Sequence, residues 1–326
     1  MKAELITRPY SDLTVVNAAR VSFDKESDFL TNDDGTYAGS RNQLKEEDIR
    51  LINYLARHNH WTPFSHVRET FFLQAPINLA KLSYTDIAGM VWEECLQKIR
   101  HSLWGWSALL KTEAICSEDR VRIQSILATL YPHSWAAFGN VPAVATKSDL
   151  EHHRMHLETN PDFIDFTMRE TVPIFVARQR FKHMVGFTYN EVSRRYVDDT
   201  PELFSPDEWR GKPDGSIKQG SAGVIPRETI FFADAPTFSE EGYSESGFNQ
   251  YALNLYRWLL LRGVAPEQAR MILPQSMYTS YYVTAPLSAW KRAMHQRLDP
   301  HAQKEIQDLA KMWEKNLKAI VPDCLW

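Results

Sequence analysis

Apolar and polar positions recur with different periods along this 326-residue chain, and the changes of period divide it into segments. Residues 45–59 (KEEDIRLINYLARHN) place apolar side chains at helical spacing, whereas residues 66–77 (HVRETFFLQAPI) are rich in β-forming residues. Residues 14–23 (TVVNAARVSF) are compatible with either a strand or a helix. The first third of the chain is therefore predicted to be mixed α and β.

The composition changes from about residue 78 to residue 160. Residues 86–110 and 119–131 are rich in Trp and Leu at spacings typical of amphipathic helices. No Ser/Gly-rich linker or low-complexity tract divides the chain, which favours one elaborated domain over two. We predict a single domain over residues 1–326 with a helical insertion at about 78–160.

The last third is predicted to be helical after a long loop. Residues 198–226 contain many Pro, Gly, Ser and Asp, and loops of this length in compact domains are often functional. Three later segments are predicted as helices, several of them with an acceptable Pro or Gly stop: residues 247–263, 265–283 and 301–320. The predicted fold class is α+β with a majority of helix.

The bulk composition excludes several classes of protein. A hydrophobic content of 44% fits a packed core, and 37 Lys and Arg against 41 Asp and Glu give a net charge of -4, so no general attraction to nucleic acid is expected. The N-terminus lacks the apolar core of a signal peptide, and no apolar run approaches the roughly 18 residues of a membrane span. Cys95, Cys116 and Cys324 are too few and too far apart for a disulfide framework or a thiolate metal site. We expect a cytoplasmic protein with neither a membrane nor a nucleic-acid partner.

Cationic and titratable side chains gather in the segment FVARQRFKHMVGFTYNEVSRRYV, which begins two residues after Pro173. If Pro173 lies in the first turn of a helix, Arg178 and Lys182 share one face. Gln179 and His183 then share the neighbouring face. Arg offers paired donors for phosphate, Lys a point charge, and Gln a donor and an acceptor for a uracil-like edge. The segment therefore predicts a site for a nucleotide monophosphate.

The second half of this segment, NEVSRRY, places Glu191, Ser193 and Arg195 at alternate positions. In an extended chain these three side chains point the same way, so that a carboxylate, a hydroxyl and a guanidinium meet one ligand. The alternative is a solvated basic helix followed by a salt-bridged turn, because charge runs are usually on the surface. Composition alone does not decide between the two interpretations.

The same segment resembles the signature of the flavin-dependent thymidylate synthases, in which APIFVARQWxRHR leads through a short spacer to NExSxRY. Three further blocks resemble that family in the correct order: residues 55–66 (LARHNHWTPFSH), 269–279 (ARMILPQSMYT) and 297–306 (RLDPHAQKEI). The resemblance implies the fold of that family, an α+β fold with a central, mostly antiparallel sheet flanked by helices. The predicted helical insertion is an addition to it.

The resemblance also implies a role for each matched residue. The implied nucleotide-binding residues are Gln179, Lys182, Glu191, Ser193, Arg194, Arg195, Arg270 and Arg297. The implied flavin-contacting residues are His60, Thr62, Lys182, His183, Met184, Glu191, Ser288 and Arg292. Arg297 and Ser193 are the implied catalytic residues. By resemblance, Arg297 stabilises the N3-ionised pyrimidine, which makes the ring carbon a better nucleophile without a covalent enzyme adduct.

The implied activity is the reductive methylation of dUMP to dTMP. FAD is the implied cofactor, NADPH the reductant and methylenetetrahydrofolate the carbon donor, in a homotetramer whose active sites are shared between chains. None of the cysteines lies in a cationic motif, so a route that adds a thiolate to the pyrimidine fits less well. The sequence has neither GxGxxG nor GxxxxGK, so a Rossmann or P-loop site is not expected.

The chain departs from the family signature at one place, where Lys182-His183-Met184 replaces Arg-His-Arg and the spacer to Ser193 is one residue longer. Lys keeps the charge without the paired donors, and Met keeps neither. One hypothesis is that Arg180 supplies a missing contact. Two alternatives for the function stay open: methylation or hydroxymethylation of another pyrimidine nucleotide such as dCMP, and a non-catalytic binder of nucleotides or single-stranded nucleic acid.

Two histidine pairs, His58/His60 and His152/His156, have the spacing of metal ligands. Neither HExxH nor cysteine ligands accompany them, so we expect no metal.

Trp92, Trp104 and Trp106 form an aromatic stripe in the predicted insertion. The ordinary role of such residues favours core or subunit interface over a platform for folate.

Overall fold

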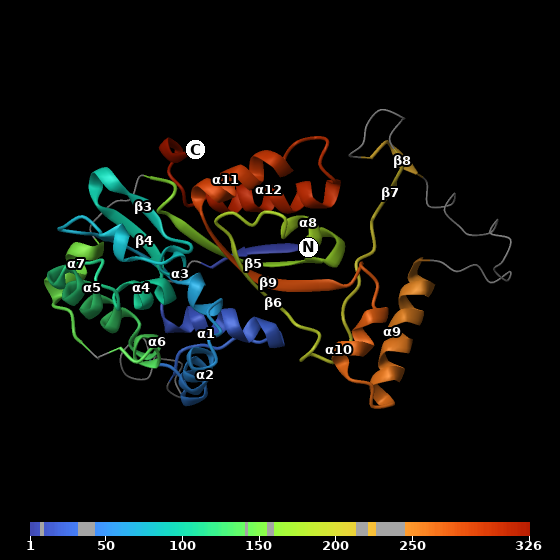
Figure 1. The fold of residues 1–326 in the computed structure, drawn as a ribbon. Helices are drawn as coiled ribbons and strands as arrows, with labels where there is room; N and C mark the ends of the chain where they lie inside the picture. The colour runs from blue at the N-terminus through green and yellow to red at the C-terminus, as the bar shows by residue number, and fades with distance from the viewer. Residues whose placement is uncertain (7–9, 32–42, 141–142, 155–159, 213–220, 226–244) are drawn as a thin grey trace, which may run out of the picture.

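A four-stranded antiparallel sheet in the order β1-β5-β9-β6 forms the centre of the molecule (Figure 1). The computed structural model describes residues 1–326 except 7–9, 32–42, 141–142, 155–159, 213–220 and 226–244. The strands are β1 (Lys2–Leu5), β5 (Asp165–Pro173), β9 (Tyr278–Pro286) and β6 (Thr188–Glu191). In the middle of the sheet, β5 and β9 pair along their whole length, from Pro173 opposite Tyr278 to Asp165 opposite Pro286.

Three helices cover one side of this sheet, as Figure 1 shows: α8 (Ile174–Arg180), α11 (Leu287–Arg297) and α12 (Lys304–Lys318). Both α8 and α11 begin directly after a proline that ends a strand, Pro173 and Pro286. Proline has no N–H to give to a sheet, and its fixed φ suits a helix start, so each strand changes into a helix at that residue. This confirms the prediction of a helix beginning beside Pro173.

A second layer of helices lies on the other side and to one end of the sheet. It contains α1 (Asp12–Arg20), α2 (Glu46–Arg57), α3 (Tyr84–Ile87), α4 (Leu103–Leu109), α5 (Ser117–Leu130), α6 (Pro132–Ala137) and α7 (Lys147–Arg154). A 3₁₀ turn at Pro63–His66 precedes a three-stranded antiparallel sheet of order β2-β4-β3. Trp106 is fully buried in this layer, and Trp92 and Trp104 pack against its core, as the aromatic stripe predicted.

The prediction of helix throughout residues 86–110 is wrong, because two strands of the second sheet lie there. They are β3 (Val91–Glu93) and β4 (Lys98–Ser102), and β4 pairs with β2 (Arg68–Phe72) on its other edge. As the middle strand, β4 is buried on both faces and so lacks the alternation that marks a half-buried strand. Within residues 88–110, the α-helix that the Trp and Leu spacing predicted is confined to Leu103–Leu109, whereas the helix predicted over residues 119–131 forms as α5.

The prediction of helix over residues 265–283 is also wrong in its second half. The segment forms α10 (Pro266–Ala269) and a 3₁₀ turn (Arg270–Ile272), and then enters β9 at Tyr278. Pro274 interrupts the helical pattern, and Tyr, Thr and Val are favoured in strands. The helices α9 (Glu245–Leu261) and α12 match their predictions, and the loop at 198–226 contains the short pair β7 (Trp209–Arg210) and β8 (Val224–Ile225). Residues 213–220 and 226 of that loop lie outside the described residues.

Buried polar side chains join the two layers. Arg68 of β2 donates to Asp165 Oδ1 at 2.9 Å, and Arg100 of β4 donates to the same oxygen at 2.5 Å. Arg68 also donates to the carbonyl of Gly186 at 3.2 Å and to Thr188 Oγ1 at 2.9 Å. The second layer therefore holds the loop that connects α8 to β6. In the described part of the chain, no helix is long and apolar enough to cross a lipid bilayer.

His66 is completely buried between the layers. Its Nδ1 lies 2.7 Å from Thr284 Oγ1 and its Nε2 lies 3.2 Å from Asn190 Oδ1. Burial lowers the pKa of His66 from 6.5 to about 3, against the Asn190 hydrogen bond that raises it. Burial likewise lowers the pKa of His101 on β4 to about 4. Both imidazoles are therefore neutral in the folded protein at physiological pH.

We expect the protein to lose stability as the pH falls below 6.5. Between a folded pKa of about 3 or 4 and the ordinary 6.5, the unfolded chain binds more protons, so stability is complete above pH 6.5 and decreases towards pH 4. Each of the two histidines should contribute about 1.4 kcal/mol per pH unit. Urea denaturation from pH 7.5 to 4.5 measures this slope. In the His66→Gln variant the slope of unfolding free energy against pH should fall by the contribution of one histidine, about 1.4 kcal/mol per pH unit. An unchanged slope would contradict the conclusion that His66 is neutral in the folded protein.

Candidate active site

The C-terminal ends of α8 and α11 meet through a guanidinium and an imidazole. Arg297 donates from Nε to His183 Nε2 at 2.8 Å and from Nη2 to the carbonyl of Gln179 at 3.4 Å. Because a guanidinium only donates, Nε2 is the acceptor and the ring proton is on Nδ1. Burial, and then the charges of Arg180, Arg297 and Arg292, lower the pKa of His183 to about 4. A neutral imidazole thus orients Arg297.

The residues that follow α8 alternate between buried and exposed positions. His183 is buried, whereas Lys182 and Met184 on either side of it are exposed. Val185 is also exposed, and its carbonyl accepts a hydrogen bond of 2.5 Å from Arg292 Nη2. The loop therefore presents an ammonium group and two apolar side chains to solvent, and a guanidinium of α11 holds it.

The hypothesis that Arg180 replaces a missing ligand contact is wrong. Arg180 is fully buried, with Nε 3.1 Å from Glu170 Oε2 and Nη1 donating to Tyr189 Oη at 2.7 Å. Its guanidinium lies over the rings of Phe187, Trp290 and Trp313, at 4.4, 4.9 and 4.5 Å from their centroids. The quoted family signature has Trp at this position. In this protein the Arg180 guanidinium occupies the place among the aromatic rings, and Glu170 is its counterion.

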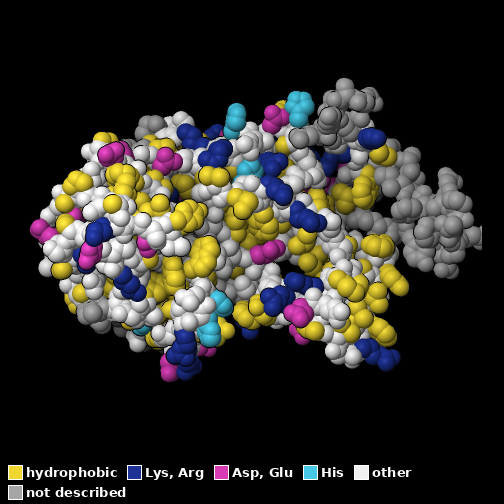
Figure 2. Space-filling view, viewed as in Figure 1, with side chains coloured by type: hydrophobic (Ala, Val, Ile, Leu, Met, Phe, Trp, Pro, Cys, Tyr) yellow, Lys and Arg dark blue, Asp and Glu magenta, His cyan; other side chains and the backbone are white. Residues whose placement is uncertain are grey.

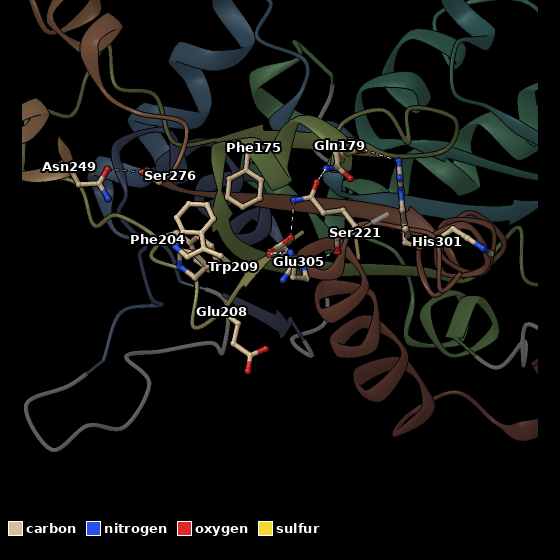
Figure 3. A pocket seen from close by; sticks show the side chains of 15 residues that line it. Phe175, Gln179, Phe204, Glu208, Trp209, Ser221, Asn249, Ser276, His301 and Glu305 are labelled. Carbon is tan, nitrogen blue, oxygen red and sulfur yellow. Dashed lines mark hydrogen bonds and ion pairs between the residues drawn. The ribbon is translucent and has the colours of Figure 1, made fainter. Parts of the chain in front are cut away.

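Gln179 and Arg297 line a cavity of about 630 Å³ beside the end of α8 (Figure 3). Side chains that the sequence interpretation missed complete its wall, among them Phe204, Trp209, Arg210, Gln303 and Glu305. Gln303 and Glu305 lie in the quoted block RLDPHAQKEI, so the block pointed to them. Phe204 and Trp209 come from the loop at 198–226, where only loop length suggested a function.

A second group of predicted residues lies at the end of β6. Glu191 Oε1 accepts a hydrogen bond of 2.8 Å from Thr279 Oγ1. Burial raises the pKa of Glu191 above its usual value, against the Thr279 hydrogen bond and the charge of Arg270. Arg270 is exposed and follows α10. Arg270 is thus close enough for its charge to act on the carboxylate of Glu191.

The prediction that Glu191, Ser193 and Arg195 form one extended row is wrong. The strand ends at Glu191, the Ser193 N–H donates to the carbonyl of Ser22 at 2.9 Å, and the chain turns at residues 194–196. In this turn Arg194 pairs with Asp199 at 2.8 Å and Arg195 with Glu267 at 3.5 Å. The alternative of a salt-bridged turn describes this part better, because a turn does not alternate its side chains as a strand does.

The remaining predicted residues lie apart from these groups. His60 and Thr62 precede the 3₁₀ turn Pro63–His66, and the exposed His60 ring lies 5.9 Å from that of Tyr54. Ser288 is in the first turn of α11, one turn before Arg292. Among the described residues, we find no hydrogen bond or ion pair that joins the group at His183 and Arg297, the group at Glu191, and His60.

The described residues contain no group of three or more His, Cys, Asp or Glu side chains that could hold a metal ion. The His58 and His60 rings lie 6.3 Å apart, and His153, next to His152, pairs with Glu69 at 2.9 Å. His156 lies outside the described residues.

The central sheet and its helices hold the guanidinium of Arg297 at the wall of a cavity of about 630 Å³, a size typical of enzyme sites for small molecules. The chain matches the family model described as thymidylate synthase complementing protein over residues 4–82 and 144–323, and it belongs to that family. Residues 83–143, which include β3, β4 and α3 to α6, lie outside the match. The insertion expected at about 78–160 stays a prediction.

Relatives that bear the name flavin-dependent thymidylate synthase share between 27% and 35% of the aligned residues. The protein of Thermosipho melanesiensis is 35% identical over 169 residues, which cover 52% of this chain and 68% of that protein. The protein of Thermus thermophilus is 33% identical over 181 residues, covering 53% and 60%. The protein of Aquifex aeolicus is 27% identical over 330 residues, covering 92% of both chains. The alignments thus span 68% and 60% of the first two relatives and 92% of the third.

Among solved structures, the UMP/dUMP methylase PolB from Streptomyces cacaoi with 5-Br dUMP aligns over 98% of this chain and 90% of its own. The sequence identity is 20% and the TM-score 0.40, which is too low to bear on function.

Proposed function

We propose that this protein is a flavin-dependent thymidylate synthase, which methylates dUMP reductively to dTMP. Methylenetetrahydrofolate is the proposed carbon donor and NADPH the proposed reductant, in the cytoplasm. Family membership supports this proposal, and Arg297 is the observation that carries it. Its guanidinium is oriented by His183 and the Gln179 carbonyl at the wall of a cavity of about 630 Å³, a volume typical of sites for small molecules.

The proposed role of Arg297 follows from its charge and its fixed position. A guanidinium beside the pyrimidine stabilises the negative charge of the N3-ionised ring and so increases the nucleophilicity of C5. Because His183 is neutral, it orients Arg297 without adding a second positive charge. Ser193 is the second proposed catalytic residue. The proposed contacts to the nucleotide come from Gln179, Lys182, Glu191, Arg194, Arg195 and Arg270.

The donor set around α8 and α11 fits FAD. Lys182 and Arg292 are exposed cations suited to its phosphates, and Met184 and Val185 beside them are 74% and 75% exposed, which suits contact with a flat ring. His60, Thr62, His183, Glu191 and Ser288 are the other proposed flavin-side residues. When bound, FAD would supply the redox chemistry of the reaction.

A homotetramer with shared active sites is the proposed assembly. Among the described residues, no hydrogen bond or ion pair joins the group at His183, the group at Glu191 and His60, and in the proposed assembly another copy completes each site. Helix α9 exposes large apolar side chains: Phe248 by 58%, Tyr251 by 64%, Trp258 by 50% and Leu261 by 86%. Figure 2 shows apolar side chains gathered over this part of the molecule. An exposed patch of this kind favours an interface between subunits.

An absorption spectrum and an assay test the proposed function. We expect the purified protein to carry or take up FAD, and to form dTMP from dUMP only when methylenetetrahydrofolate, NADPH and FAD are all present. Turnover of dCMP without turnover of dUMP would instead support the alternative nucleotide. A colourless protein that takes up no FAD and binds oligonucleotides with a steep salt dependence would support the non-catalytic alternative.

A further inference from the structure

A chain of hydrogen bonds along the cavity wall leads from a carboxylate to Gln179 (Figure 3). Arg210 Nη2 donates to Glu305 Oε1, and Gln303 Nε2 donates to Glu305 Oε2 at 2.8 Å. Gln179 Nε2 in turn donates to Gln303 Oε1. All four side chains line the cavity, and they come from β7, α8, α12 and the residue just before α12.

The carboxylate determines the direction of every amide in this chain. An ionised carboxylate only accepts hydrogen bonds, so Gln303 must turn its NH₂ towards Glu305. The carbonyl oxygen of Gln303 then faces Gln179, and only the NH₂ group of Gln179 can donate a hydrogen bond to it. The Gln179 Oε1 atom remains, and among the described residues the structure gives it no hydrogen-bond partner. Gln179 is therefore left as an acceptor at the wall of the cavity.

Glu305 stays ionised in this setting. Burial alone would raise its pKa, but the hydrogen bonds from Arg210 and Gln303 outweigh burial and lower the pKa from its usual 4.5. At neutral pH the direction of the amides is therefore constant. A glutamine without such a neighbour offers either its oxygen or its nitrogen to a ligand with little difference in energy.

We propose that Glu305, acting through Gln303, is a specificity-determining residue that keeps Gln179 a hydrogen-bond acceptor for an N–H or O–H of the bound pyrimidine nucleotide. This inference rests on the proposed function. Two groups of the nucleotide have the required chemistry: the 3′-hydroxyl of the sugar and, in the neutral ring that binds before N3 is ionised, the N3–H of uracil. A cytosine ring carries an acceptor at N3, so if the base is the donor, this arrangement also favours dUMP over dCMP.

Two variants of the FAD-loaded protein test the direction of the amides. The Glu305→Gln variant lets both amides reverse, and it should weaken dUMP binding about tenfold, as expected for the loss of one oriented hydrogen bond. The double variant Gln303→Glu with Glu305→Gln places a carboxylate directly beside Gln179, which must again turn its NH₂ towards it. We expect the double variant to bind dUMP within about threefold of the wild type, since the acceptor is restored. Isothermal titration calorimetry measures the affinities, and thermal melting confirms that both variants fold.

Two analogues identify the donor on the nucleotide. N3-methyl dUMP lacks the N3–H, and 2′,3′-dideoxyuridine monophosphate lacks the 3′-hydroxyl. The analogue without the relevant donor should bind the wild type and the Glu305→Gln variant equally, whereas the other should show the tenfold difference. An unchanged dUMP affinity in Glu305→Gln, or a double variant as weak as the single one, overturns the inference and leaves the proposed function standing. A wild-type protein that binds no dUMP overturns both.

Discussion

Replacing Arg180 by methionine is expected to lower the free energy of unfolding by about 3–5 kcal/mol, the usual cost of leaving one partner of a buried ion pair alone. Glu170 is fully buried, and it also accepts a hydrogen bond from Tyr281 Oη at 2.6 Å. Without the guanidinium, the carboxylate keeps its charge in an apolar core or takes up a proton, and both cost free energy. Urea denaturation of the wild type and Arg180→Met measures the difference.

Two controls separate the ion pair from the loss of a large side chain. Arg50 pairs with Glu46 at 3.2 Å on the surface, with side-chain exposures of 68% and 84%, so Arg50→Met should change stability by no more than about 0.5 kcal/mol. The double variant Arg180→Met with Glu170→Gln removes the buried charge, and it should be more stable than Arg180→Met alone. If Arg180→Met lies within about 1 kcal/mol of the wild type, the pair does not stabilise the α8 end of the site.

Replacing Arg297 by glutamine is expected to reduce kcat/KM for dUMP by about 10²–10³, because removing one oriented donor at a developing charge has effects of this size. Gln keeps a donor but no positive charge to stabilise the ionised pyrimidine. Arg297→Lys keeps the charge without the paired donors, and its activity should lie between those of the wild type and Arg297→Gln. Steady-state assays with dUMP at saturating cofactors measure kcat and KM separately.

Arg50→Gln makes the same change on the exposed face of α2, which contributes no residue to the cavity wall, and it should leave kcat/KM unaltered. The FAD absorption spectrum of Arg297→Gln shows whether the variant still holds the cofactor. An Arg297→Gln protein that binds FAD and retains activity within about fivefold of the wild type would remove Arg297 from the catalytic residues.

The sequence predicted those helices whose apolar side chains recur within a few positions of one another. The helices α2, α5, α9 and α12 show apolar side chains at helical spacing, and α8 begins beside Pro173 as expected. The strands β4 and β9 were missed because each pairs with a strand remote in sequence, β2 for β4 and β5 for β9. The edge strand β3 pairs with its near neighbour β4, but its three residues are too few to show a period. Layers packed on both faces of the sheets bury β4 and most of β9, and this removes the alternation that would reveal a strand.

Some features of the candidate site were likewise predicted from the sequence, and others were not. Motif spacing singled out Gln179, His183 and Arg297, and the structure brings these three together. Motif spacing did not predict that Ser193 and Arg195 lie in a turn, because the carbonyl that accepts the Ser193 N–H where the strand ends belongs to Ser22, far upstream. Nor did it predict which atom of Gln179 faces the cavity, since this depends on a carboxylate of α12.

The order of residues along the chain thus determined the helices α2, α5, α9 and α12 and the residue types of a nucleotide site, because these depend on side chains within a few positions of one another. Only the tertiary structure decided which cationic side chains are paired in the core and which are available to a ligand. Arg180 looks like a free cation in the sequence, but Glu170 on β5 and the rings of α11 and α12 make it part of the core. Among the described residues Arg297 has no such counterion, and its donors meet a neutral imidazole and a carbonyl. Its charge is therefore left for a ligand.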